Sequence, residues 1–495
     1  MSQGPLQALL EHNRATMALR QIEGLLGWDQ ETVMPKSGGA QRAEQAAAIN
    51  GAIHARDTDP KVAEWLAAVD RTGLDDIAGR NVAEIERAYA RATKMPAGLS
   101  AEIARVTSAA QGIWADARAA NKFADFASTL EQVLKLKREA ASCLAEDGQG
   151  HYDALLQDYE PGMDTETLSG LLEGMRPRLS ALRAVIDASG KAVEPLRGSY
   201  PKAAQLAVSA KVAEAFTYNF DAGRLDLAVH PFSSGDYGDV RITTRVDEAE
   251  PLGCIYSTIH EVGHAVYEQN ISPELFYTPV GQHVSMGVHE SQSRMFENQI
   301  GRSRAFAEWL FPEMRDAFAE LNVTSPQGLY EAVNRVSTGF IRTEADEVHY
   351  NLHILLRFEL ERDLIAGDLN VGDVEAEWNR RFERDFGRVV PDAANGVLQD
   401  VHWSLGVFGY FPTYSLGNIY AAQQFARMHE DIPDLETHIA NGDIKPLADW
   451  VGKKVHGPGN LLPPSELMEK VTGAKADSAA LLEYLEAKFG EMYGV

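Results

Sequence analysis

The amino-acid sequence predicts a mainly α-helical protein with a small β-sheet, organised as one domain over residues 1–495. Three observations lead to this prediction. Apolar residues recur at three- and four-residue steps through most of the chain, which is the spacing of helices with one buried face. One stretch between residues 223 and 250 instead alternates apolar and polar side chains, as a strand does. No linker rich in proline and serine, charge run or internal repeat divides the chain.

The N-terminal part is predicted to be a long antiparallel array of helices. Leucines and isoleucine over residues 6–26 fall three or four positions apart, so they form one apolar stripe on a helix. Residues 28–35 end in a proline and precede a Ser-Gly-Gly sequence, which predicts a loop before the next helix. From there to about Ser189 the pattern stays helical, with breaks near Pro96 and Pro161.

Two short segments have the alternation expected of β-strands. Residues 225–229 and residues 240–244 each alternate apolar or β-branched side chains with others, and turn residues separate the two segments. This pattern predicts a hairpin or a small sheet. After Pro251 the helical pattern returns, with a loop rich in glycine and aromatic residues over residues 396–417.

The net charge argues against a protein that binds polyanions. The chain has 46 basic and 72 acidic side chains, for a formal net charge of −26. Binding to nucleic acid or to anionic lipid depends on lysine and arginine, and no basic stripe stands apart from this acidic background. The apolar content of 45% and the ordinary glycine and proline counts exclude collagen-like and disordered classes. We therefore expect no nucleic-acid and no membrane partner.

The cysteine content favours a reducing compartment. Cys143 and Cys254 are the only cysteines, so neither a disulfide framework nor a cysteine-based zinc site can be built. The N-terminal sequence lacks the basic and apolar segments of a signal peptide, and no run of about 18 apolar residues occurs. These features predict a cytoplasmic location.

A His-Glu-x-x-His motif, His260-Glu261-x-x-His264, carries the clearest chemical signal. The surrounding residues have an apolar helical stripe, so the motif is predicted to lie on a helix. Two histidines four positions apart project from the same side of a helix and can bind one metal ion. Glu261, one position further round, can accept a proton from a metal-activated water without being a ligand. The alternative is a chance match on a solvated helix face.

A catalytic zinc site with two histidines needs a third protein ligand, and Glu290 is our candidate. The extended pattern with a third histidine fails here, because Tyr267 and Asn270 occupy the positions of its glycine and histidine. Glu290 follows His264 by 26 residues and begins another helical pattern, which a loop can return beside the first helix. The resulting set would be His260, His264 and Glu290. The alternative reading of Glu290 is a surface glutamate.

Several short segments together resemble one known family. In chain order they are His230-Pro231-Phe232, Asp239-Val240-Arg241-Ile242-Thr243, the His-Glu-x-x-His motif, His289-Glu290-Ser291-Gln292, Ile341-Arg342-Thr343-Glu344-Ala345-Asp346 and Gly396-Val397-Leu398-Gln399-Asp400-Val401-His402-Trp403. This series resembles the signature of the carboxypeptidase Taq family of metallocarboxypeptidases. Further likeness at residues 28–35 and 409–417 extends it over nearly the whole chain.

The resemblance implies a two-lobed helical metallopeptidase fold around a deep groove, with the small sheet beside the active site. It further implies a homodimer, with one zinc ion per chain or sometimes cobalt. The implied activity is stepwise release of single amino acids from the free C-termini of peptides, with broad specificity.

Peptide hydrolysis also needs a general base and a donor for the tetrahedral oxyanion. Glu261 is the natural base, and afterwards it can protonate the leaving amine. Tyr410, Tyr414 and His402 from the aromatic loop are the candidate oxyanion donors, by analogy with related helical metallopeptidases. The alternative is that the two tyrosines only pack the loop.

An exopeptidase must bind a free carboxylate, for which arginine offers a two-pronged donor. Arg342 and Arg241 are the candidates, and Arg342 is favoured. The alternative for each is an ion pair with a nearby acid. His230 is a candidate for closing the groove end, although a strand-terminating turn explains it equally well.

Two competing functions remain open at this point. An endopeptidase or oligopeptidase on the same scaffold would not need an arginine for the terminal carboxylate. A helical scaffold with a structural metal would not need Glu261, and substitution of this residue would then change nothing.

Overall fold

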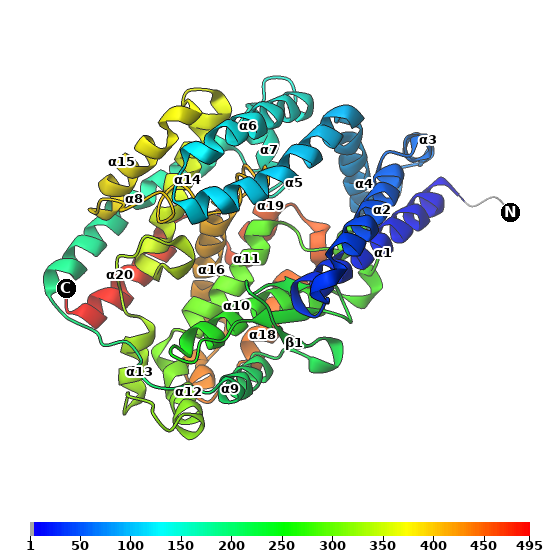
Figure 1. The fold of residues 1–495 in the computed structure, drawn as a ribbon. Helices are drawn as coiled ribbons and strands as arrows, with labels where there is room; N and C mark the ends of the chain where they lie inside the picture. Colours follow the sequence, from blue (N-terminus) through cyan, green and yellow to red (C-terminus); the bar gives the residue numbers. More distant parts are fainter. Residues whose placement is uncertain (1–3) are drawn as a thin grey trace.

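The computed structural model describes residues 4–495, so the first three residues of the predicted domain lie outside the described residues. Helices make up most of the protein, as predicted (Figure 1). The helices before the sheet are α1 (Pro5–Thr32), α2 (Gly39–Asp57), α3 (Pro60–Ala68), α4 (Asp76–Lys94), α5 (Ala97–Ala120), α6 (Ala124–Leu144), α7 (His151–Leu156), α8 (Thr165–Ser189) and α9 (Lys202–Ala215).

The first helix is longer than the sequence predicts. Helix α1 continues to Thr32, so the prediction of a loop at residues 28–35 was wrong for residues 28–32. Trp28 is 5% exposed, and the guanidinium carbon of Arg241 lies 4.2 Å from the centroid of its ring. Because no proline lies between Pro5, the first residue of the helix, and Pro35, the helix can continue until this large side chain is buried.

Helices α1 to α4 form one end of the molecule, at the right of Figure 1. They enclose a small apolar cluster, separate from the main core, whose buried members are Leu9, Val62, Leu66, Val69, Val82 and Ile85. A single larger cluster runs through the rest of the protein. That the whole chain is one domain stays a prediction.

The small sheet has three strands, β1 (Leu225–Leu227), β2 (Ser233–Ser234) and β3 (Arg241–Thr244). Their order is β1-β3-β2, with Leu225 opposite Ile242 in a parallel pair and Ser233 opposite Ile242 in an antiparallel pair. Both predicted strands are present. They do not form a hairpin with each other, because parallel strands cannot be joined by a tight turn and the connection between them contributes β2.

The helices after the sheet form the centre and the C-terminal side. They are α10 (Leu252–Gln269), α11 (Met286–Arg294), α12 (Arg304–Ala317), α13 (Pro326–Val333), α14 (Glu347–Ala366), α15 (Val374–Phe386), α16 (Phe411–Asp431), α17 (Leu435–Ala440), α18 (Lys445–Val451), α19 (Pro464–Thr472) and α20 (Ala479–Tyr493). Helix α11 continues into a π-helical segment, Met295–Ile300. Helices α10, α11 and α16 lie in the middle of the fold (Figure 1). Among residues 4–495, no helix is both long and apolar enough to cross a bilayer.

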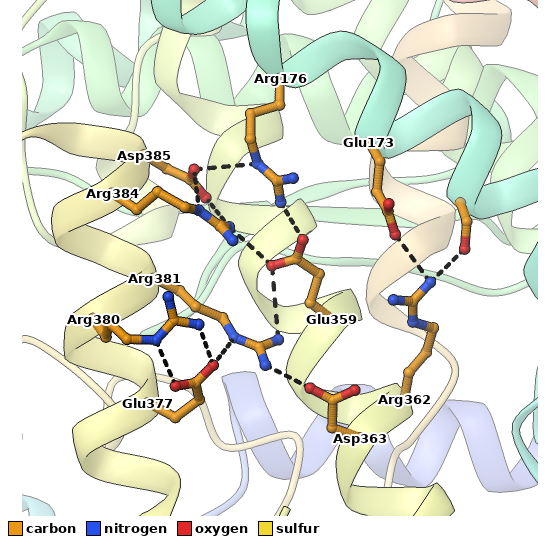
Figure 2. Close-up of polar contacts among 11 residues, drawn as sticks. Glu173, Arg176, Glu359, Arg362, Asp363, Glu377, Arg380, Arg381, Arg384 and Asp385 are labelled. Atoms are coloured by element: carbon orange, nitrogen blue, oxygen red, sulfur yellow. Dashed lines mark hydrogen bonds and ion pairs between the residues drawn. The ribbon is translucent and has the colours of Figure 1, made fainter. Parts of the chain in front are cut away.

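An ion-pair network joins helices α8, α14 and α15 (Figure 2). Glu359 of α14 accepts from Arg176 of α8 and from Arg384 of α15, the latter at 2.9 Å. Arg381 of α15 bridges Asp363 at 2.5 Å and Glu377 at 2.6 Å. The members of this arginine network are Arg176, Glu359, Asp363, Glu377, Arg380, Arg381, Arg384 and Asp385, and a separate pair of Glu173 with Arg362 lies beside them. The network holds α14, which is buried along most of its length, between two neighbours.

Candidate metal centre

Helix α10 carries both histidines of the His-Glu-x-x-His motif. Its apolar stripe, which includes Ile255, Ile259 and Val262, is fully buried and packs the helix into the core. His260 and His264 lie one turn apart, with side chains 22% and 16% exposed. The helix predicted for this motif is therefore confirmed, and both imidazoles lie on its more accessible side.

Helix α11 returns beside α10 and brings Glu290 to the two histidines. Oε2 of Glu290 lies 3.6 Å from Nε2 of His260 and 3.3 Å from Nε2 of His264. Two glycines allow this approach. A Cβ on Gly263 of α10 would lie 2.5 Å from a backbone atom of α11, and one on Gly417 of α16 would lie 2.6 Å from Cγ of Glu290. The absence of side chains at these positions lets three helices meet around the cluster.

The spacing of the three donor atoms fits one divalent metal ion. In a tetrahedral site with metal–ligand distances of about 2.1 Å, neighbouring ligand atoms lie about 3.4 Å apart. The distances of 3.3 and 3.6 Å lie on either side of that value. Two imidazoles and one carboxylate are also the donors of one type of catalytic zinc site. His260, His264 and Glu290 are called the metal centre below.

Burial and neighbouring charges set the ionisation of these ligands. Burial lowers the pKa of His260, but the carboxylates of Glu290 and Glu297 outweigh it and raise this pKa to about 9. Burial and the neighbouring His289 lower the pKa of His264 to about 3. Burial raises the pKa of Glu290, but the charge of His260 and the hydrogen bond with His264 bring it down to about 2. Glu290 is therefore ionised at neutral pH, as a carboxylate ligand of a metal has to be.

Each ligand histidine is also held through its outer ring nitrogen. Nδ1 of His260 lies 3.0 Å from Oε2 of Glu297. Glu297 in turn accepts from Arg294 at 2.9 Å and from Arg302 at 3.0 Å. Nδ1 of His264 instead lies 2.6 Å from Nδ1 of His289. Such outer contacts set the orientation and tautomer of a metal-binding imidazole.

Glu261 lies between the metal centre and the sheet. Its side chain is buried, and the backbone N–H of Ser233 in β2 donates to its carboxylate. Burial raises the pKa of Glu261 to about 7, against the opposing charge of His260. A carboxyl with such a pKa can exchange a proton near neutral pH. The sheet therefore lies beside the site, as the resemblance implied.

The three predicted oxyanion donors lie together at the start of α16. Nε2 of His402 is 3.4 Å from the hydroxyl of Tyr414, and the rings of Tyr410 and Tyr414 have centroids 5.1 Å apart. Burial raises the pKa of Tyr410 to about 12, and the charge of Glu290 acts in the same direction. The hydroxyl of Tyr410 therefore stays protonated and lies within electrostatic reach of the metal centre.

Arg342 is buried next to these tyrosines but already has a carboxylate partner. Its Nε and Nη2 both lie 3.0 Å from Oδ1 of Asp400, whose other oxygen, Oδ2, pairs with Nη2 of Arg357 at 2.5 Å. Its Nη1 lies 3.5 Å from the hydroxyl of Tyr350, and its guanidinium carbon lies 5.0 Å from the centroid of the Tyr414 ring. One edge of the guanidinium is thus engaged within the protein.

Arg241 and His230 do not join this group. Arg241 donates to both oxygens of Asp239, at 2.7 and 2.8 Å, and lies over Trp28 of α1. The side chain of His230 is exposed, just before the edge of the sheet. Among the described residues, we find no contact of either side chain with the metal centre.

Sequence reasoning assigned no role to three residues that support the ligands, although their spacing carried a signal. Glu297 follows Glu290 by seven residues, which is close to two helical turns and hence the same face. Glu268 follows His264 by four residues on α10. His289 directly precedes Glu290 in a motif already singled out. A search for carboxylates and histidines one or two turns from each ligand would have found them.

Comparison with known proteins finds similarity to metallocarboxypeptidases along nearly the whole chain. The sequence profile described as carboxypeptidase Taq (M32) metallopeptidase matches residues 8–489. Thermostable carboxypeptidase 1 of Thermus thermophilus is 42% identical over 99% of both chains. The crystal structure of an M32 carboxypeptidase from Deinococcus radiodurans R1 superposes with a TM-score of 0.96 at 39% identity, covering 99% of this chain and 100% of that one.

A solved structure from a eukaryote is also similar. Metallocarboxypeptidase 1 of Trypanosoma cruzi has a TM-score of 0.95 at 33% identity, covering 98% of this chain and 99% of that one. These matches span the helices, the small sheet and the metal centre alike. The chain belongs to the carboxypeptidase Taq (M32) family of metallopeptidases.

Proposed function

We propose that this chain is a zinc-dependent carboxypeptidase that removes single amino acids, one after another and with broad specificity, from the free C-termini of peptides. Membership of the family supports the metal-dependent carboxypeptidase activity. The observation that carries the assignment to this site is the convergence of His260, His264 and Glu290, with Glu261 buried beside them. Cobalt is the alternative metal.

The protein side of the reaction divides among these residues. His260, His264 and Glu290 would hold the ion, which when bound supplies Lewis acidity to polarise the peptide carbonyl and to acidify water. Glu261 accepts a proton from the attacking water and then delivers it to the nitrogen of the leaving amine. Its pKa of about 7 suits both directions of this transfer.

Charge that develops on the carbonyl oxygen needs a fixed hydrogen-bond donor. Tyr410 and Tyr414 serve this role as protonated hydroxyls, because burial raises the pKa of each. Burial also lowers the pKa of His402 to about 4, so this residue acts as a neutral imidazole beside Tyr414.

Arg342 is the preferred partner for the terminal carboxylate of the substrate. It lies against Tyr414, and its Nη1 has only a long contact to Tyr350. The geometry of Arg241 favours the structural alternative, since both prongs of its guanidinium bind Asp239. A role for His230 at the end of the groove stays a prediction. Cytoplasmic location and a homodimer complete the proposal.

One observation favours the second candidate, an endopeptidase or oligopeptidase on the same scaffold. Asp400 occupies one edge of Arg342, which leaves less of its guanidinium for a substrate carboxylate. An internal peptide segment would not need this contact.

Mass spectrometry of one unblocked peptide tests the proposal. The peptide is digested by zinc-loaded protein, by chelated protein and by a Glu261→Gln variant shown to bind zinc. We expect a ladder that shortens by one residue at a time from the C-terminus, a rate lowered by about 10²–10⁴-fold in the variant, and no digestion after chelation.

Other products would change the assignment. Internal fragments that disappear with chelation would establish the endopeptidase and remove the role of Arg342. Absence of cleavage by protein with stoichiometric zinc, or full activity of Glu261→Gln, would favour a scaffold with a structural metal.

A further inference from the structure

A second group of potential ligands lies directly behind the metal centre. The group consists of Glu268 of α10, His283 of the loop between α10 and α11, and His289 of α11. Their three donor atoms lie within 4.8 Å of one another. The carboxylate of Glu268 is 5% exposed and His289 is also mostly buried. This group is either a second cation site or a set of hydrogen bonds that serves the first site.

The distances distinguish these two possibilities. Nδ1 of His283 lies 2.9 Å from Oε1 of Glu268, and Nε2 of His289 lies 3.0 Å from the same oxygen. Both are the length of a hydrogen bond, and both are shorter than the separation of about 3.4 Å between ligands of one tetrahedral zinc ion. The corresponding distances in the metal centre are 3.3 and 3.6 Å. The second group therefore has hydrogen-bond geometry.

The free oxygen of Glu268 does not change this conclusion. Oε2 is buried and has no protein partner among the described residues, which by itself would suit a cation. Both histidine nitrogens, however, converge on Oε1. An ion held at Oε2 would thus have one protein ligand from this group, too few for a specific zinc site.

The positions of the ring protons on His264 and His289 can be assigned in turn, starting from His264. If His264 binds the ion through Nε2, its only proton is on Nδ1, so Nδ1 donates to Nδ1 of His289. The proton of His289 is then on Nε2, which donates to Oε1 of Glu268. An ionised carboxylate completes the series as an acceptor, and the hydrogen bonds from His283 and His289 lower the pKa of Glu268 despite its burial.

Packing fixes the orientation of the His289 ring, which lies between His264 and Glu268 in this series of hydrogen bonds. The ring of His289 is nearly parallel to that of Tyr267, with centroids 5.2 Å apart and an interplanar angle of 22°. The rings of His264 and His289 are within 15° of parallel. His289 is thus held between a metal ligand and a buried tyrosine, and it can accept and donate at its two nitrogens without rearrangement.

We propose that His289 and Glu268 are positioning residues that hold His264 with its Nε2 free for the metal, and that Glu268, His283 and His289 do not form a second cation site. We call the hydrogen-bonded series His264–His289–Glu268 the relay. It couples the negative charge of Glu268 to His264 through one neutral imidazole, that of His289, whereas His260 contacts its carboxylate, Glu297, directly. This proposal rests on the metal centre described above and extends it.

The test measures zinc binding to the full-length protein by competition with a chromophoric chelator, together with the zinc stoichiometry. His289→Phe keeps the ring and removes both hydrogen bonds. Glu268→Leu removes the final acceptor, while Glu268→Gln keeps a carbonyl oxygen for His289. His456→Phe is the matched control, because His456 also stacks on Tyr267, at 4.6 Å, but has no hydrogen bond to the relay.

We expect one zinc ion per chain in the wild type and about 10- to 100-fold weaker binding in His289→Phe and Glu268→Leu. Glu268→Gln should lose less affinity than Glu268→Leu, and His456→Phe should bind as the wild type does. At saturating zinc, kcat should recover in the relay variants. Unfolding in chelator provides the control for stability, because a residue with only a structural role would change that transition and leave zinc affinity unaltered.

Two results would overturn the proposal. Unchanged zinc affinity in His289→Phe would remove the relay. A second zinc ion in the wild type that is lost in His283→Ala would make this group a cation site. His264→Ala separates these failures from failure of the metal centre itself, because unchanged zinc binding in that variant would reject the underlying ligand assignment.

Discussion

The arginine network and the metal centre both contain charged side chains that the fold buries wholly or in part, but their charges are balanced differently. The network has four carboxylates and four arginines, so its charges cancel within the protein (Figure 2). Around the metal centre, four carboxylates face two arginines. They are Glu261, Glu268, Glu290 and Glu297 against Arg294 and Arg302. With the histidines neutral, as metal binding requires, 4 − 2 = 2 negative charges have no cationic side chain, and in the metal-free protein a proton on His260 offsets part of this excess.

This difference separates a structural from a functional use of buried charge. Ion pairs whose charges cancel need no further ligand to offset the cost of burying them. An excess of two negative charges within one polar cluster is offset by a divalent cation or by bound protons. The charge excess thus supports the proposed binding of an ion at the metal centre, whereas the charges of the arginine network cancel without one.

The largest expected effect is on zinc affinity when one of the excess charges is removed. Glu290→Gln replaces a ligand and should weaken zinc binding by more than the roughly 100-fold that outer contacts contribute. The chelated variant should be less stable than the chelated wild type near neutral pH, because the pKa of Glu290 is lowered in the folded protein and its ionised form therefore stabilises the metal-free fold. Competition titration and denaturant unfolding measure the two quantities. Retention of wild-type affinity would contradict the assignment of Glu290.

Removal of the metal should be the next largest effect. Free zinc at about 1,000 times its dissociation constant should raise the free energy of unfolding by about 4 kcal/mol, because the ion binds the folded state. Urea unfolding with zinc and with chelator measures this difference. A Glu359→Gln variant should have the same gain, since the arginine network is not part of the metal centre. A gain lost in that variant would show that the two regions are coupled.

Glu160 tests a third arrangement, a buried carboxyl with no cationic partner. Burial raises its pKa to about 7, with opposing hydrogen bonds that include the N–H of Gly287 at 3.0 Å. Because the folded-state pKa is raised, its stability contribution is complete below the unfolded pKa of about 4.5 and is lost as pH rises through about 7.

Glu160→Gln removes this titration. The stability of the wild type relative to the variant should therefore fall between pH 4.5 and pH 9, by an amount on the order of 3 kcal/mol. Urea unfolding of both proteins at a series of pH values measures it. A pH-independent difference would indicate that Glu160 is ionised in the folded protein, as the carboxylates of the arginine network are.

The smallest effect is expected from Glu359→Gln in the absence of metal. This change leaves Arg176 and Arg384 short of a partner, and should lower the free energy of unfolding by about 2 kcal/mol after allowance for the partial exposure of the arginines. Denaturant unfolding in chelator measures it. Glu377→Gln, at the more exposed side of the network, is the matched comparison and should cost less.

Much of the fold and of the metal centre follows from the sequence. Helical periodicity predicted the helix of His260 and His264, and the failure of a third histidine pointed to a carboxylate. It could not predict that α1 continues through Trp28, because the burial of that side chain depends on Arg241, more than 200 residues away. The parallel pairing of β1 with β3 could not be predicted either, because it too depends on contacts between segments that are separate in the sequence.

The contacts around the site show most clearly what the sequence can predict and what depends on the tertiary structure. The sequence by itself determined which side chains share a helix face, since the rise and turn of a helix are the same everywhere. Only the tertiary structure decided that Glu290 meets both histidines, that Asp400 engages Arg342, and that His289 stands behind His264. Those contacts depend on how closely separate helices can approach, which packing at Gly263 and Gly417 sets and local periodicity does not encode.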